Sequence, residues 1–195
     1  MSIVMNWLRN LFLRAKHWQI FLIFAATMLL AQIAMFNSMQ LGTVLDFGKG
    51  LLAFWRVTWL SALCFNVWFW AMGSFLNAIV GQRLRPSLGL FRFALIYPLL
   101  YLPIFMISFP QQPALLAIIL PLHLIAMFCG FYLLNFVARN LSLAEMGKRV
   151  RFSDYAGTFF LLWFFPLGVW IVQPKINRLC TQAGNHEILS ERPAD

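Results

Sequence analysis

The sequence contains little charge, and acidic residues are especially few. Only 11% of its 195 residues are charged, and only six are Asp or Glu. Soluble domains carry about 25% charged residues, so this chain has too few to cover the surface of a soluble core. Its hydrophobic fraction is 62%. The composition therefore excludes an ordinary soluble protein and predicts an all-α, polytopic helical membrane protein.

Cysteine and the common catalytic motifs are also missing or scarce. The three cysteines are odd in number and form no C-x-x-C pair, which excludes a disulfide framework and a thiol-redox pair. There is no H-E-x-x-H, no G-x-S-x-G and no glycine-rich phosphate loop. No cluster of Cys, His and carboxylate residues suits a metal, and a haem would need a second histidine at matching depth. The sequence therefore predicts no catalytic residue, no cofactor and no metal.

Long apolar runs are what the sequence has in abundance. A helix needs about 20 apolar residues to cross the hydrocarbon core of a bilayer. Four runs come close to or exceed this length, and they predict transmembrane spans at residues 18–36, 57–78, 93–109 and 114–137. The first run is long for a signal peptide and no A-x-A site follows it, so we expect it to be retained. We predict one helical membrane domain over residues 1–178 and a polar C-terminal tail over 179–195.

The N-terminal segment, residues 3–16, has an amphipathic pattern. Its apolar residues recur at helical spacing at Val4, Trp7, Leu8, Leu11 and Phe12. Its polar residues fall on the other face, which is typical of a helix that lies in the membrane interface. The alternative is that the segment is only the basic flank of the first span.

The basic residues predict the orientation. The net charge is +9, and Lys and Arg gather before the first span and in the loops after the second and fourth spans. Because such residues concentrate in cytoplasmic loops, we expect a multi-pass protein of the cytoplasmic (inner) membrane of a bacterium, with a cytoplasmic N-terminus. Four arginines are expected to contact the anionic headgroups of the bilayer: Arg83, Arg85, Arg149 and Arg151. No compact basic domain remains for nucleic acid, so none is expected as a partner.

A fifth apolar segment, residues 157–173, is densely aromatic and is interrupted by Pro166. A straight helix of this length would cover only about 26 Å, which is at the short limit for a span. The proline breaks the helix, and basic residues follow the segment. We therefore favour a re-entrant or interfacial segment over a fifth span. Five of its residues are predicted to face lipid or a partner: Trp163, Phe164, Phe165, Pro166 and Trp170.

The second span carries a stripe of small and polar residues. These residues recur at roughly whole helical turns: Thr58, Ala62, Asn66, Gly73 and Asn77. Small residues let membrane helices approach closely, and amides bond across the contact, so we predict a packing seam within the bundle or between protomers. The alternative is the lining of a pore or substrate path.

His123 is the one ionisable residue placed deep in a predicted span. Such residues are functional candidates by default. Here we expect a neutral imidazole that is hydrogen-bonded to a backbone carbonyl or to Tyr97 or Tyr101. A separate signal, Ser142-x-x-Glu145, has the pattern of a capping box and predicts the start of a short helix.

Three functions are compatible with these patterns. The first is a non-enzymatic integral membrane subunit or scaffold that oligomerises or packs against a membrane protein partner. The second is a small oligomeric channel, pore or transporter, lined by the stripe or by the proline-kinked third and fourth spans. The third is a membrane enzyme acting on lipid headgroups, with His123, Asp154 and nearby arginines. We favour the first, because the sequence offers contact faces but no catalytic set.

Overall fold

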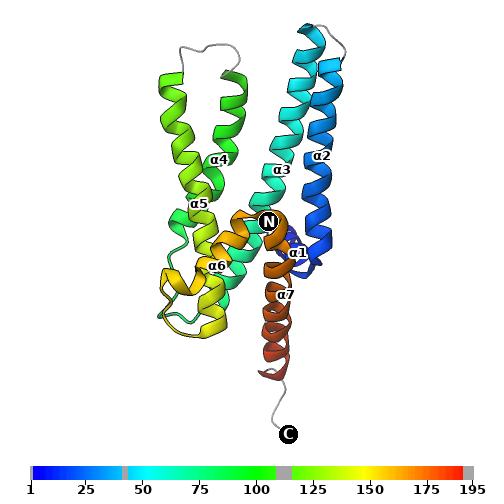
Figure 1. Cartoon of the computed structure of the whole chain (residues 1–195). Helices are drawn as coiled ribbons and strands as arrows, with labels where there is room; N and C mark the ends of the chain where they lie inside the picture. Colours follow the sequence, from blue (N-terminus) through cyan, green and yellow to red (C-terminus); the bar gives the residue numbers. More distant parts are fainter. Residues whose placement is uncertain (1, 41–43, 109–115, 191–195) are drawn as a thin grey trace. The chain divides into compact units, whose positions relative to one another are not determined.

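Helices and the turns between them make up the whole of the chain that the computed structural model describes, which is residues 2–40, 44–108 and 116–190. No strand occurs within these residues, so the predicted all-α class is confirmed for them. Figure 1 shows the helices in chain order: α1 (Ser2–Arg14), α2 (His17–Gln40), α3 (Val44–Ile79), α4 (Gly89–Ser108), α5 (Leu116–Met146), α6 (Phe152–Trp163) and α7 (Phe165–Ser190).

Three of the described helices contain stretches that are long and apolar enough to cross a membrane. These stretches are His17–Asn37 in α2, Lys49–Ile79 in α3 and Ala117–Met146 in α5. They include the predicted spans 18–36 and 57–78 and most of the predicted span 114–137, and they indicate a membrane protein. The apolar part of α4, Gly89–Phe105, is shorter. The end of the predicted span 93–109 lies outside the described residues.

Several helices extend beyond the runs that hydropathy marks. Helix α5 continues through Ser142, which is buried, so the prediction that a new helix starts there is wrong. The residues from Ala138 to Met146 include good helix formers and no Gly or Pro, and the helix ends only before Gly147, whose φ of 65° suits glycine. The next helix, α6, starts after Arg151, whose backbone N–H donates to Asp154 Oδ2 at 2.7 Å.

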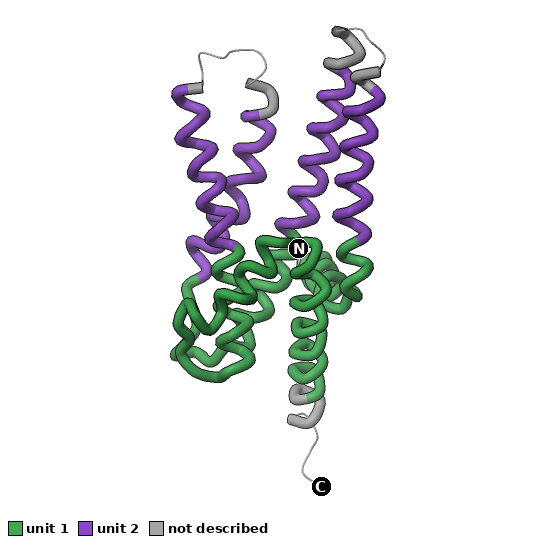
Figure 2. The backbone as a smooth tube through the Cα atoms, in the orientation of Figure 1, with its two compact units in different colours: residues 1–21, 67–87, 134–195 green, residues 22–66, 88–133 purple. Residues whose placement is uncertain are grey.

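The helices contribute to two compact units, drawn in different colours in Figure 2. Unit 1 comprises residues 1–21, 67–87 and 134–195, and unit 2 comprises residues 22–66 and 88–133. In unit 1, Trp68 is fully buried, and its ring packs edge-on against Phe69 and Phe165, with centroids 5.3 and 5.5 Å apart. This apolar core holds α7 against α3.

Unit 2 exposes many large apolar side chains. Leu100 on α4 is 65% exposed and Phe128 on α5 is 63% exposed, and similar residues line the unit 2 part of α2. Exposing this apolar surface to water is unfavourable in free energy, whereas contact with lipid tails, which are equally apolar, carries no such penalty. The surface of unit 2 therefore suits a bilayer.

The aromatic segment 157–173 is divided between two helices, and Pro166 does not mark the break. Helix α6 ends at Trp163, Phe164 forms the turn and α7 begins at Phe165. Pro166 lies in the first turn of α7, where its missing N–H has no helical partner to lose. The expectation that Pro166 interrupts the helix is therefore corrected: the break lies two residues earlier. Helix α7 continues to Ser190, so the boundary predicted between residues 178 and 179 falls inside it.

Candidate functional site

A buried glutamine connects three helices of unit 1. Gln173 on α7 has no exposed surface. Its Oε1 accepts a hydrogen bond from Trp68 Nε1 of α3 at 3.0 Å. Its Nε2 donates to the carbonyl oxygen of Phe12 at 2.9 Å and also faces Ala15 O at 3.1 Å and Asn177 Oδ1 at 3.0 Å. We call Gln173 with these four partners the glutamine hub.

The hub supplies hydrogen-bond donors to the backbone carbonyl groups at the C-terminal end of α1. The last carbonyl groups of a helix have no partner within it and must find one elsewhere. Gln173 Nε2 faces the carbonyl groups of Phe12 and Ala15. Asn177 lies one helical turn further along α7, and its Nδ2 donates to the same Ala15 carbonyl at 3.1 Å. Sequence reasoning missed both amides, because the signal is only a Gln and an Asn spaced by four residues in α7.

A glycine sets the close approach of α6 and α7. A Cβ atom built on Gly168 would collide with the backbone carbonyl of Leu161 on α6. Glycine therefore allows the two helices to meet just beyond the turn at Phe164. The N–H groups of Leu167 and Gly168 both donate to Phe164 O, at 2.9 and 3.0 Å, and these bonds define the turn. We call this α6–α7 turn the elbow.

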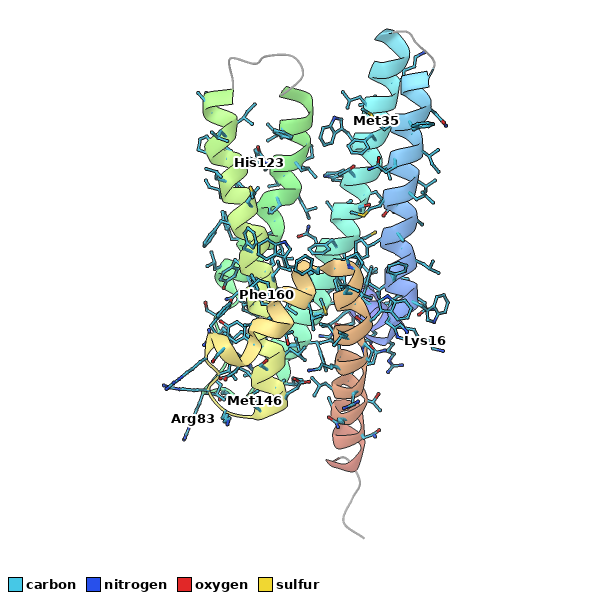
Figure 3. All side chains as sticks on the ribbon, in the orientation of Figure 1. Lys16, Met35, Arg83, His123, Met146 and Phe160 are labelled. Carbon is cyan, nitrogen blue, oxygen red and sulfur yellow. The ribbon has the colours of Figure 1, made fainter. Side chains whose placement is uncertain are left out.

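The elbow presents a contiguous stretch of chain rich in exposed apolar side chains. Each is between 47% and 67% exposed: Phe160, Trp163, Phe164, Leu167, Trp170 and Ile171. We call these six residues the elbow patch, and Figure 3 labels Phe160 on α6. Three of them belong to the predicted interface set. Phe160, Leu167 and Ile171 were missed, because exposure on a densely apolar segment cannot be read from composition.

Phe165, Pro166 and Trp170, which also belong to the predicted interface set, have different surroundings. Phe165 turns toward Trp68, as described above, and Pro166 is exposed. Trp170 keeps one side against α2, where its ring lies 4.5 Å from the His17 ring and 5.9 Å from the Phe21 ring. Trp170 therefore joins the elbow patch to the start of the first apolar helix.

The four arginines predicted to meet lipid headgroups all belong to unit 1. Arg83, labelled in Figure 3, is exposed in the connection between α3 and α4. Arg85 Nη2 donates to the carbonyl oxygens of Ala78 at 2.8 Å and Val80 at 3.3 Å, so this side chain also caps the end of α3. Arg149 and Arg151 are exposed in the connection between α5 and α6. That connection is followed directly by the helix that leads to the elbow.

The polar residues of the α3 stripe bond locally. Thr58 Oγ1 donates to Phe54 O at 2.8 Å and Asn66 Nδ2 donates to Ala62 O at 2.9 Å, both within α3. Asn77 Nδ2 donates to Pro86 O at 3.0 Å, which ties the end of α3 to the following connection. Gly73 is buried. Within the described residues, none of these bonds joins α3 to another helix.

His123 lies on α5 beside an aromatic column on α4 (Figure 3). Its ring is 5.9 Å from that of Tyr101 and 5.4 Å from that of Phe105. The tyrosine hydroxyls donate instead to carbonyls of α5: Tyr97 to Leu122 at 3.0 Å and Tyr101 to Ile119 at 3.3 Å. Among the described residues, His123 Nδ1 is buried without a hydrogen-bond partner. The expected bond from His123 to either tyrosine is therefore not seen, and the histidine is held by ring contacts.

The column itself was not anticipated. Aromatic residues recur at every fourth position of α4, and their successive centroids are 5.5, 6.0 and 5.9 Å apart: Phe93, Tyr97, Tyr101 and Phe105. Aromatic residues four apart share a helix face, so the spacing was a readable signal that the abundance of phenylalanine concealed. With its two hydroxyl bonds to α5, the column holds the α4–α5 pair together.

No group of three or more His, Cys, Asp or Glu side chains within the described residues is arranged to hold a metal ion. Glu145 pairs with Lys175 at 3.0 Å, and Asp154 serves the start of α6. Comparison of the chain with protein-family models, with curated proteins and with solved structures finds no match.

Proposed function

We propose that the protein is a non-enzymatic integral membrane subunit that uses the elbow patch to pack against a membrane protein partner or a second copy of itself. The observation that carries this proposal is the patch: six large apolar side chains, each between 47% and 67% exposed, on one short stretch of chain. Large exposed apolar patches commonly mark interaction sites, and tryptophan is enriched where binding energy concentrates.

The support beneath the patch favours docking over loose contact. Gly168 brings α7 against α6, and the glutamine hub anchors α7 to α1 and α3 within the same unit. A surface held by buried hydrogen bonds loses little conformational freedom on binding, which lowers the cost of association. The amide of Gln173 thereby holds helices together, which suits a scaffold.

The topology we propose has four spans, α2 to α5, with α1 in the interface and the elbow re-entrant or interfacial. Helix α6 has 12 residues and covers about 18 Å, too little to cross the hydrocarbon core. Unit 1 contains the Lys and Arg residues of four separate segments, and this supports placing it on the cytoplasmic side: residues 9–16, 83–85, 139–151 and 175–178. The membrane proposed is the bacterial inner membrane.

Purification in a mild detergent tests the docking role. The expected result is a complex, either an oligomer or a stoichiometric assembly with another membrane protein. Leu167→Ser should disrupt it, because Leu167 is 67% exposed, the highest fraction among the six patch residues. Leu100→Ser, at a position 65% exposed on unit 2, is the matched control and should leave the complex intact. A monodisperse monomer with no co-purifying protein would contradict the proposal.

A further inference from the structure

A groove lies between the C-terminal end of α1 and the second half of α7, within unit 1. It has a volume of about 380 Å³ and is lined by seven residues: Leu13, Arg14, Asn177, Cys180, Thr181, Gly184 and Asn185. Pockets that hold small ligands in proteins span about 300–1,000 Å³, so this groove can take a lipid headgroup or a molecule of similar size.

The lining favours a negatively charged group. Arg14 supplies a guanidinium, and no acidic residue is among the seven lining side chains. A guanidinium recognises phosphate oxygens with paired hydrogen bonds and stays charged at every physiological pH. In the described part of the chain, Asn177 uses one amide N–H on Ala15 O, and an asparagine amide carries two. Its second N–H and the amide of Asn185 add neutral donors to the groove.

The end of α1 does not oppose an anion here. The C-terminus of a helix carries partial negative charge on its last carbonyl groups, which would repel a phosphate. In this structure the carbonyls of Phe12 and Ala15 accept hydrogen bonds from the hub amides, which offsets that charge. Among the seven lining side chains, the charged group is the cation of Arg14.

The neighbouring surface points to the membrane interface. Val4, Trp7 and Leu11 recur at helical spacing on α1 and are 63%, 60% and 48% exposed. Such a row is typical of a helix lying at the level of the headgroups. The groove begins at the other end of the same helix. A phosphate held there would belong either to a lipid or to the aqueous phase.

We propose that this groove is a binding site for a phosphate group, carried by the headgroup of an anionic phospholipid or present as free phosphate. Arg14 binds the phosphate oxygens, and Asn177 and Asn185 donate beside it. Leu13, Cys180 and Gly184 form the less polar wall. The groove shares no residue with the elbow patch, so this site and the docking role can fail independently.

Alkylation of Cys180 by N-ethylmaleimide reports occupancy of the groove, because Cys180 lines it. The measurement uses the full chain in detergent with Cys64→Ser and Cys129→Ser, so that one thiol remains. Three additions are compared: dihexanoyl phosphatidylglycerol, dihexanoylglycerol without a phosphate, and sodium phosphate. With phosphatidylglycerol in about fourfold excess over its Kd, alkylation should slow about fivefold, because only the empty fraction reacts.

Three variants separate binding from folding. Arg14→Gln should abolish the slowing, whereas Arg178→Gln, on the same α7 but outside the lining, should keep it. Gly184→Leu should also abolish it: a Cβ at this position meets no atom within 4 Å, so the leucine fills the groove without a clash. The melting temperature of each variant without ligand checks that it is folded.

The three additions decide the source of the phosphate and the fate of the proposal. Slowing by phosphatidylglycerol alone assigns a lipid headgroup, and slowing by sodium phosphate as well, or alone, assigns the phosphate group itself. Equal slowing by dihexanoylglycerol would show that only apolar contact matters and would overturn the site. Slowing by none of them, or slowing that persists in folded Arg14→Gln, would overturn it too.

Discussion

At the scale of single residues, the most informative side chain is one that composition does not reveal. Gln173 is polar, yet it is fully buried and bonded to three segments of unit 1. A buried polar group without a hydrogen-bond partner costs about 1–3 kcal/mol of folding free energy. Loss of Gln173 would therefore destabilise the protein through the groups that it now pairs. The residue explains why α7 can remain attached to unit 1 while much of its surface is exposed.

Replacing Gln173 by leucine should destabilise the protein by about 2–3 kcal/mol, because Trp68 Nε1 and Phe12 O lose their partners. The free energy of unfolding in detergent, followed by tryptophan fluorescence, measures this loss. Gln182→Leu is the matched control on α7, where the side chain is exposed, and should change stability little. A stability equal to that of the unaltered chain would show that the hub is dispensable.

At the scale of elements, the elbow depends on a glycine and not on a proline. Gly168 has no room for a Cβ against Leu161, whereas Gly157 in α6 has open space at the same position. Gly168→Ala should therefore force the helices apart and cost about 1–3 kcal/mol, as overpacking usually does. Gly157→Ala should stabilise the chain by about 0.5–1 kcal/mol through helix propensity.

The same unfolding measurement distinguishes the two alanine variants. The diagnostic result is the difference in sign, because the substitution is chemically identical. If Gly168→Ala were as stable as Gly157→Ala, the close approach of α6 to α7 would not exist in solution. Loss of the detergent-stable complex in Gly168→Ala alone would further connect the elbow to docking.

Pro166→Ala should change stability by less than about 1 kcal/mol, because Pro166 occupies the first turn of α7 and removes no helical hydrogen bond. Helicity measured by far-ultraviolet circular dichroism should stay constant. A rise in both helicity and stability would mean that the proline does interrupt a continuous helix, as the sequence had suggested.

At the scale of the whole molecule, the proposed topology predicts the side on which α7 ends. Cys180 should be protected from a membrane-impermeant maleimide in intact cells and become labelled after permeabilisation. The reason is that a re-entrant elbow returns the basic residues Lys175 and Arg178 to the cytoplasm.

A cysteine near the start of α3 provides the opposite control. Lys49→Cys, in a chain whose three native cysteines are serine, should be labelled in intact cells. Labelling of Cys180 under the same conditions would show that the aromatic segment crosses the membrane and that the C-terminus lies outside.

Much of the fold was accessible from sequence, and the reasons are specific. The apolar runs that became α2, α3 and α5 are long and apolar enough to cross a membrane, so their helical type was predictable. Their ends were not: α3 starts at Val44, and α5 reaches Met146 because helix formers continue beyond its apolar run. The sequence analysis placed the break at Pro166 and not at Phe164, because a proline is visible in a sequence, whereas the close approach of Gly168 to the Leu161 carbonyl is not.

The sequence by itself predicted the all-α class, since long apolar runs placed in lipid can satisfy their backbone groups within helices. It also predicted that side chains of the aromatic segment 157–173 would face lipid or a partner. Only the tertiary structure decided which of these aromatics face outward, that Gly168 sets the elbow, and that Gln173 and Asn177 close the end of α1. The closure of α1 depends on residues more than 100 positions apart meeting in space, as Phe12 and Gln173 do, and no local pattern encodes such a meeting.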